Sequence, residues 1–144
     1  MYNVLGEVTM LITIKKGTPV QLTNNFTTSE FECPCSDCTV NYIEMDLVNK
    51  LQELRDEYGS LIHISSGFRC PKHNASVGGV SASAHQSGLA VDIQPIVMNV
   101  DELDKIYDLA FKKFDNIGDG RRLKFVHIDV RPVKPDGKKR TWTY

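Results

Sequence analysis

The sequence predicts an α+β fold in which helices pack on a small antiparallel or mixed sheet. Two segments carry apolar residues at helical spacing, and short apolar runs of strand length lie before, between and after them. No internal repeat divides the 144 residues, and no linker rich in proline, glycine or serine does so. With 41% hydrophobic and 24% charged residues, the chain is expected to fold as one domain, residues 1–144.

Two amphipathic helices are expected from the spacing of apolar side chains. In residues 44–58 these side chains recur every three or four positions: Met45, Val48, Leu51, Leu54 and Tyr58. Gly59 follows and is expected to end this helix. Residues 100–114 have the same periodicity: Leu103, Ile106, Tyr107, Ala110 and Phe114. A short helix is also expected to begin at Pro71.

Five runs have the length and the apolar or β-branched character of strands. They are residues 8–14, 61–64, 89–93, 124–130 and 140–144. Between them, Gly67 permits a tight change of chain direction after the second run. Three aromatic residues are expected in the core rather than at a binding surface: Phe68, Phe125 and Trp142.

Charge is distributed unevenly along the chain. The formal net charge is -1, yet residues 121–144 hold eight Lys and Arg residues against two Asp residues. Such a segment suits an ordinary solvated surface or an anionic polymer such as cell wall. Basic and aromatic residues do not form a nucleic-acid-binding motif, so no nucleic-acid partner is expected.

Membrane insertion is not expected, because the longest apolar runs are much shorter than the roughly 18 residues of a membrane span. Residues 1–14 are mildly apolar but lack the basic leader and the small-residue cleavage site of a secretory signal. The chain is therefore expected to be synthesised in the cytoplasm. We also expect it to act as a monomer.

Four cysteines fall in two places: Cys33, Cys35 and Cys38 lie in one short run, and Cys70 follows about thirty residues later. In a reducing compartment disulfides are disfavoured, and clustered thiols indicate metal binding or have no special role. Three interpretations stay open: a four-thiolate zinc site, one or two disulfides, or free and partly buried thiols.

His85, Asp92 and His127 lie at strand or loop positions from which they can converge on one metal ion. Gly88 lies between the first two and lets the backbone turn tightly. Two imidazoles and a carboxylate suit a catalytic zinc, which takes three protein ligands and keeps a fourth position for water. The remaining histidines, His63 and His73, are expected to be structural.

The residues around these ligands form two motifs, Ser83-x-His85-x-x-Gly88-x-Ala90-x-Asp92 and His127-x-Asp129, and residues 66–74 precede the first of them. The two motifs closely resemble the metal motif of the zinc D-Ala-D-Ala carboxypeptidases, and residues 66–74 resemble the stretch that precedes it in that family. The resemblance covers about Phe31 to Asp92 and Lys124 to Tyr144, which is most of the chain.

This resemblance implies zinc held by His85, Asp92 and His127, and a fold shared with lysostaphin-type peptidases and the hedgehog signalling domain. It also implies substrate-binding roles for Arg69 and Ser83, with Arg69 holding a carbonyl or carboxylate during catalysis.

The implied activity is hydrolysis of amide bonds in peptidoglycan stem peptides by a D-Ala-D-Ala carboxypeptidase or a related endopeptidase, such as a phage lysis enzyme (endolysin). The enzyme would then have to reach the wall by another route, as phage lysis proteins do through holes made by a partner. The alternative is a zinc-stabilised binding module without catalytic activity.

The general base departs from the pattern of some family members, which place a glutamate three residues before the last histidine. Here that position is Lys124, and the nearest carboxylate is Asp129, on the same face of the expected strand. Asp129 is therefore predicted to be the catalytic base. The alternative is that it only orients His127.

Overall fold

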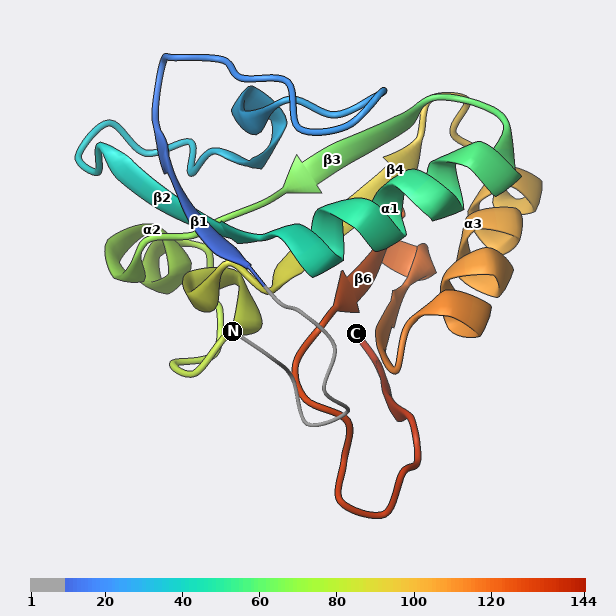
Figure 1. Ribbon diagram of the computed structural model, residues 1–144. Coiled ribbons are helices and arrows are strands. Elements are labelled where there is room, and N and C mark those ends of the chain that lie inside the picture. Colours follow the sequence, from blue (N-terminus) through green and yellow to red (C-terminus); the bar gives the residue numbers. More distant parts are fainter. Residues whose placement is uncertain (1–9) are drawn as a thin grey trace.

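The computed structural model describes residues 10–144 and confirms the predicted α+β fold (Figure 1). Three α-helices are described: α1 (Met45–Tyr58), α2 (Pro71–Ser76) and α3 (Val100–Lys113). Residues 1–9 lie outside the described part, so the start of the strand expected at 8–14 and most of the segment assessed for a secretory signal do too. Within the described residues, no helix is long and apolar enough to span a membrane.

The strands form two sheets. In the smaller sheet, β1 (Leu11–Lys15) pairs antiparallel with β2 (Val40–Glu44). The larger sheet has the order β3-β4-β6-β5-β7 and is antiparallel except where β5 and β7 run parallel. Its strands are β3 (Ile62–Ser66), β4 (Ala90–Pro95), β5 (Asn116–Gly120), β6 (Phe125–Asp129) and β7 (Arg140–Thr143). Each of the five predicted strand segments contains most of one observed strand, namely β1, β3, β4, β6 or β7. The other two strands, β2 and β5, were not predicted.

Both predicted long helices form, and their apolar faces are buried in the main core. In α1 the buried residues are Leu47, Val48, Leu51 and Leu54. Gly59 ends α1 in the left-handed conformation, as predicted, and its N–H donates to the carbonyl of Arg55. Asn99 caps α3, because its side chain accepts from the backbone N–H of Glu102 at 2.8 Å.

The two faces of the larger sheet have different roles. Along β4 and β6, Val91, Ile93, Val126 and Ile128 belong to the core that also contains α1 and α3 residues. Because side chains alternate along a strand, the residues between them, Asp92 and His127, point to the opposite face. The helix-covered face therefore holds the core, and the other face is left for polar residues.

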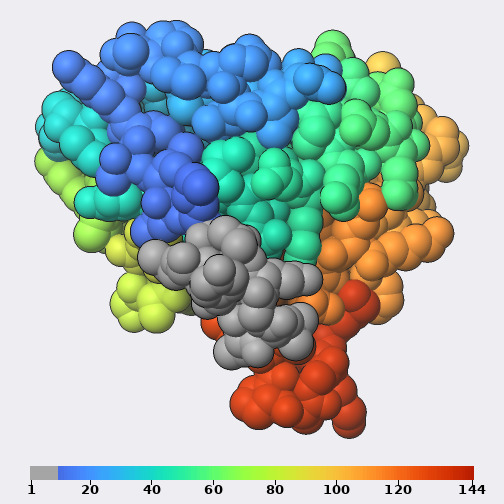
Figure 2. Space-filling view, in the orientation of Figure 1, coloured from blue at the N-terminus to red at the C-terminus, as the bar shows by residue number. Residues whose placement is uncertain are grey.

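The segment between β6 and β7 extends away from the body of the molecule, as the red part of Figure 2 shows. It belongs to the basic region 121–144. Part of that region is solvated surface, as at exposed Arg122 and Lys138, while other basic residues, such as Arg131 and Arg140, are partly buried.

Candidate metal centre

Asp92 and His127 are brought together by the register of two neighbouring strands. They are direct partners in the antiparallel pairing of β4 with β6, so their side chains lie next to each other on one face. Nδ1 of His127 lies 3.0 Å from Oδ1 of Asp92. The pairing of β4 with β6 thus determines the positions of two of the three predicted ligands.

His85 comes from the short 3-10 helix η2 (Ala84–Ser87), directly before β4. The chain returns toward the sheet at Gly88, whose φ of 73° is unfavourable for other residues, and a Cβ there would lie 2.5 Å from the carbonyl oxygen of Tyr42. This turn places Nε2 of His85 3.3 Å from Oδ1 of Asp92. One ligand atom from each of the three residues lies within 4.8 Å of the others.

Each histidine has its second ring nitrogen bound to an acceptor. Nδ1 of His85 lies 2.8 Å from the carbonyl oxygen of Gly67, and Nε2 of His127 lies 2.8 Å from Oδ2 of Asp129. Metal-binding histidines usually donate their other N–H to a carbonyl or carboxylate, which fixes the tautomer and the ring orientation. Both imidazoles are therefore held with one nitrogen directed toward Asp92.

Hydrogen bonds and charges within the site keep its two carboxylates ionised, which favours a positive charge beside them. Burial alone would raise the pKa of Asp92, but hydrogen bonds with His127 and His85 outweigh it and hold that pKa well below its usual range. For Asp129 too, burial is outweighed, here by His127 and Arg131, and the pKa is lowered. Burial acts to lower the pKa of His127, but its hydrogen bonds to Asp129 and Asp92 raise it.

These residues fit a zinc ion. Two imidazole nitrogens and one carboxylate oxygen are the donors that zinc takes in catalytic sites, and the carboxylate is kept ionised. His85, Asp92 and His127 are 2%, 7% and 4% exposed, so a cation bound between them would share the compensation of the buried Asp92 charge with Arg69. Their arrangement agrees with the ligand set implied by the sequence.

Arg69 lies beside this centre and binds the ligand carboxylate from its other side. Its Nη2 donates to Oδ2 of Asp92 at 3.2 Å, and its Nε donates to Oγ of Ser66 at 3.0 Å. A third donor, Nη1, reaches Oδ1 of Asn74 at 3.4 Å, so three partners orient the guanidinium, which lines the same pocket as His85 and His127. This position is compatible with the predicted contact to substrate.

Ser83 also lines the pocket but is mostly buried, at 8% exposure. Its hydroxyl accepts from the backbone N–H of His85 at 3.3 Å and so caps η2. This contact gives Ser83 a role in positioning His85. Its predicted contact with substrate stays a prediction.

A pocket of about 670 Å³ opens beside the three candidate ligands, within the size range of small-molecule sites. Two of the aromatic residues expected in the core, Phe125 and Trp142, are only partly buried and line this pocket instead. The third, Phe68, is buried as expected, at 4% exposure. The expectation was wrong for Phe125 because it lies on the same sheet face as His127. It was wrong for Trp142 because β7, which contains it, is an edge strand.

Several pocket residues were not predicted as functional. Arg140, Trp142 and Tyr144 alternate along the end of the chain and all line the pocket, as does Arg131. The Trp142 ring lies 5.0 Å from that of His127, centroid to centroid. The sequence could have indicated that Arg140, Trp142 and Tyr144 act together, because residues two apart on a strand share a face.

Asp129 is held inside the protein by contacts to both of its oxygens. Oδ2 accepts from Nη2 of Arg131 and lies next to His127, while Oδ1 accepts from the Arg131 backbone N–H and from its Nε. The carboxylate is completely buried, at 0% side-chain exposure. Among the described residues lining the pocket, Asp92 is the only carboxylate. This geometry favours the orienting alternative, and the base assignment stays a prediction.

The remaining predicted residues lie elsewhere. Cys33, Cys35, Cys38 and Cys70 come together in a separate cluster, and no disulfide links them. His63 is exposed on β3, and His73 is partly buried in α2. Neither histidine belongs to a group of potential metal ligands among residues 10–144.

The family model described as Peptidase M15 matches residues 24–129, which contain all three candidate zinc ligands and all four cysteines. No curated protein matches the chain.

Proposed function

Because the chain belongs to the peptidase M15 family, a family of zinc peptidases of the D-Ala-D-Ala carboxypeptidase type, we propose that it hydrolyses amide bonds in peptidoglycan stem peptides. The observation that carries this proposal is the convergence of His85, Asp92 and His127 at a pocket that Arg69 also lines. Three ligands beside an open pocket are the arrangement of a catalytic zinc, whereas a purely structural zinc takes four.

His85, Asp92 and His127 would hold the zinc, which when bound supplies Lewis-acid activation of water and of the scissile carbonyl. The chain's own groups position the reactants around it. Arg69 presents a guanidinium that can bind a carbonyl or carboxylate oxygen of the substrate through paired donors. Asp129 keeps His127 in the required orientation through the 2.8 Å contact.

The pocket also suits an anionic peptide. Arg69, Arg131 and Arg140 contribute to its lining, and Trp142 and Tyr144 add aromatic surface. A stem peptide ends in a carboxylate and has short aliphatic side chains, so guanidinium groups and aromatic rings complement its two kinds of surface. This complementarity supports the carboxypeptidase form of the proposal, with cleavage near the free end of the stem.

The test is incubation of the purified, zinc-loaded protein with a synthetic stem pentapeptide and, separately, with purified peptidoglycan. Release of a single terminal D-Ala, seen by mass spectrometry, is expected for a carboxypeptidase. New amino groups inside the stem would instead assign an endopeptidase. Chelation should abolish either product and added zinc should restore it. Absence of cleavage of both substrates by the zinc-loaded protein would refute the proposal.

A binding module without turnover is the second candidate, and one observation favours it. Among described residues, the pocket has no carboxylate besides Asp92 that could take a proton from water. A binding module should bind the stem pentapeptide in calorimetry when zinc is present and return it intact after long incubation. Catalytic turnover would exclude this candidate.

A further inference from the structure

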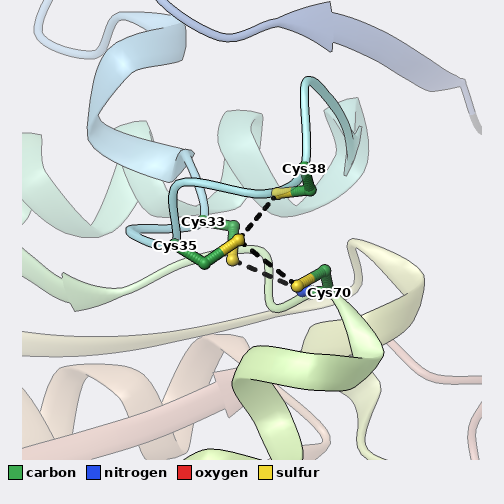
Figure 3. Close-up of side chains that lie close together, drawn as sticks. All are labelled: Cys33, Cys35, Cys38 and Cys70. Carbon is green, nitrogen blue, oxygen red and sulfur yellow. Dashed lines mark hydrogen bonds between the residues drawn. The ribbon is translucent and has the colours of Figure 1, made fainter.

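The four cysteines form a compact cluster outside the pocket (Figure 3). Three of them lie in the loop between the 3-10 helix η1 (Thr28–Phe31) and β2. The fourth, Cys70, is the residue that caps the start of α2. Figure 3 shows all four sulfur atoms directed toward one another from these two segments.

The spacing of the sulfur atoms fits a single metal ion. Sγ of Cys35 lies 3.2 Å from Sγ of Cys38 and 3.5 Å from Sγ of Cys70, and all four sulfurs lie within 4.8 Å of one another. Zinc bound by four thiolates at about 2.3 Å in a tetrahedron separates its sulfurs by roughly 3.8 Å. The distances of 3.2 and 3.5 Å are somewhat shorter than this value and are well beyond the S–S bond length of about 2.05 Å.

Backbone N–H groups are directed at two of the sulfurs. The N–H of Cys70 donates to Sγ of Cys33 at 3.5 Å, and the N–H of His73 donates to Sγ of Cys70 at 3.4 Å. Donors in these positions stabilise negative charge on sulfur, which is the form in which cysteine binds a metal.

Side chains from β2 and from Lys16, the residue after β1, add further donors around Cys38. Nδ2 of Asn41 lies 3.5 Å from its sulfur, and the ammonium of Lys16 lies 3.6 Å from it. Four thiolates and one zinc ion carry a net charge of about -2, which a neighbouring lysine partly offsets. Several donors that stabilise thiolate charge therefore reach the sulfurs, and Cys33 and Cys70 are at the same time buried against Phe68.

We propose that Cys33, Cys35, Cys38 and Cys70 bind a second zinc ion in a closed, structural site. Four protein ligands leave no position for water or substrate, so this metal takes no part in hydrolysis. The residue pattern suits such a site, because three of the four ligands come from six consecutive residues, and Cys70 connects them to a distant segment.

The site has a consequence for the pocket through residues 67–70. The carbonyl of Gly67 contacts the His85 ring, and the N–H of Arg69 donates to the carbonyl of His85 at 3.1 Å. The next residue, Cys70, is a proposed zinc ligand. Zinc bound to the cysteines therefore fixes the end of the segment that positions both Arg69 and His85.

Metal analysis of the wild-type protein is the first test. We expect two zinc ions per chain. Replacing the wild-type metals with cobalt should produce the sulfur-to-metal charge-transfer absorption of a four-thiolate site. Cys35→Ser should lose one zinc and this absorption. The matched variant Asp92→Ala should lose the other zinc and keep the absorption. A single zinc that is lost in Asp92→Ala would overturn the proposal.

Thiol alkylation of the wild-type protein gives a second test that does not depend on whether the variants fold. The four thiols should resist alkylation in the native, zinc-loaded protein and should all react after the metal is stripped, without added reductant. Thiols that react equally with and without zinc would overturn the proposal. So would thiols that become reactive only after reduction, because these would be disulfides. Neither test depends on peptidase activity, so the proposed function can fail while the second site holds.

Discussion

The metal centre and the cysteine cluster each gather candidate zinc ligands, but the fold builds them differently. His85, Asp92 and His127 come from two paired strands and the turn before one of them, and they face a pocket. The cysteines come from a loop and the start of a short helix, and they face one another. The first arrangement keeps space for a substrate, whereas the second fills its space with ligands.

This difference teaches that ligand number and access decide what a metal can do. Three ligands held by a sheet leave one side open for chemistry, and four ligands from irregular segments make a cross-link. Disturbing the metal centre should therefore change catalysis, whereas disturbing the cluster should first change metal content and the position of residues 67–70.

The largest expected effect is that of His127→Ala. Removing one of three ligands should abolish zinc binding at the metal centre and reduce peptidase activity to the background of the uncatalysed reaction. The cysteine site should keep its metal. Activity on the stem pentapeptide and zinc content by elemental analysis check this. If full activity persisted, hydrolysis could not depend on this metal centre, and the contrast between the two regions would be lost.

The next effect concerns Asp129. If it orients His127, Asp129→Asn should weaken zinc affinity by about 10- to 100-fold, and saturating zinc should restore most of the turnover. If it is the general base, kcat should stay about 100- to 10,000-fold low at saturating zinc. The buried contacts of both oxygens lead us to expect the first outcome.

Asp119→Asn is the matched control. Asp119 contacts Arg121 two residues later, just as Asp129 contacts Arg131, but in the described residues Asp119 has no hydrogen bond to His127 or to another candidate zinc ligand. Its replacement should leave zinc affinity and kcat unchanged. Titration of activity with zinc, for both variants at equal protein concentration, separates orientation from proton transfer. A kcat that stays low in Asp129→Asn alone would establish the base role.

Much of this arrangement follows from the sequence. The spacing in residues 44–58 and 100–114 predicted both long helices, because a stripe of apolar residues has few alternatives to burial. The ligand set was also expected, since His85 and Asp92 flank a glycine turn and His127 lies in a strand-like run. Alternation along that run correctly placed Asp129 on the same face as His127.

Other features depend on tertiary contacts that local patterns do not encode. β5, with the sequence Asn-Ile-Gly-Asp-Gly, has two glycines and one apolar side chain, so its own composition argues against a strand. It forms because β6 and β7 pair with it on both sides. Likewise, the approach of Cys70 to the other cysteines depends on the contact of the Phe68 N–H with the carbonyl of Phe31.

Arg69 connects the two regions, because it contacts Asp92 and precedes Cys70. Arg69→Ala should lower kcat/KM by about 10- to 100-fold, the loss expected for a hydrogen bond to a charged group. Arg69→Lys should recover only part of this, since an ammonium cannot reproduce the paired donors. Exposed Arg122 offers a control, and Arg122→Ala should have wild-type kinetics. Wild-type kcat/KM in Arg69→Ala would show that the guanidinium serves structure alone.

The smallest expected effect is at Trp142, which lines the open side of the metal centre. Its ring lies near both His127 and Tyr144, so it can contact a bound peptide or merely support the imidazole. If it contacts substrate, Trp142→Ala should raise KM by roughly 10-fold, in line with about 1.4 kcal/mol of lost aromatic contact, and leave zinc affinity unchanged.

A matched aromatic away from the pocket is Phe111, which is 40% exposed on α3. Phe111→Ala should leave KM unaltered, so a rise in KM specific to Trp142→Ala would reflect loss of substrate contact. Trp142→Phe should lie between the two, because a smaller ring retains part of the contact surface. A fall in zinc affinity with unchanged KM would instead assign Trp142 to supporting His127. The pocket would then be specified by its arginines rather than by its aromatic side chains.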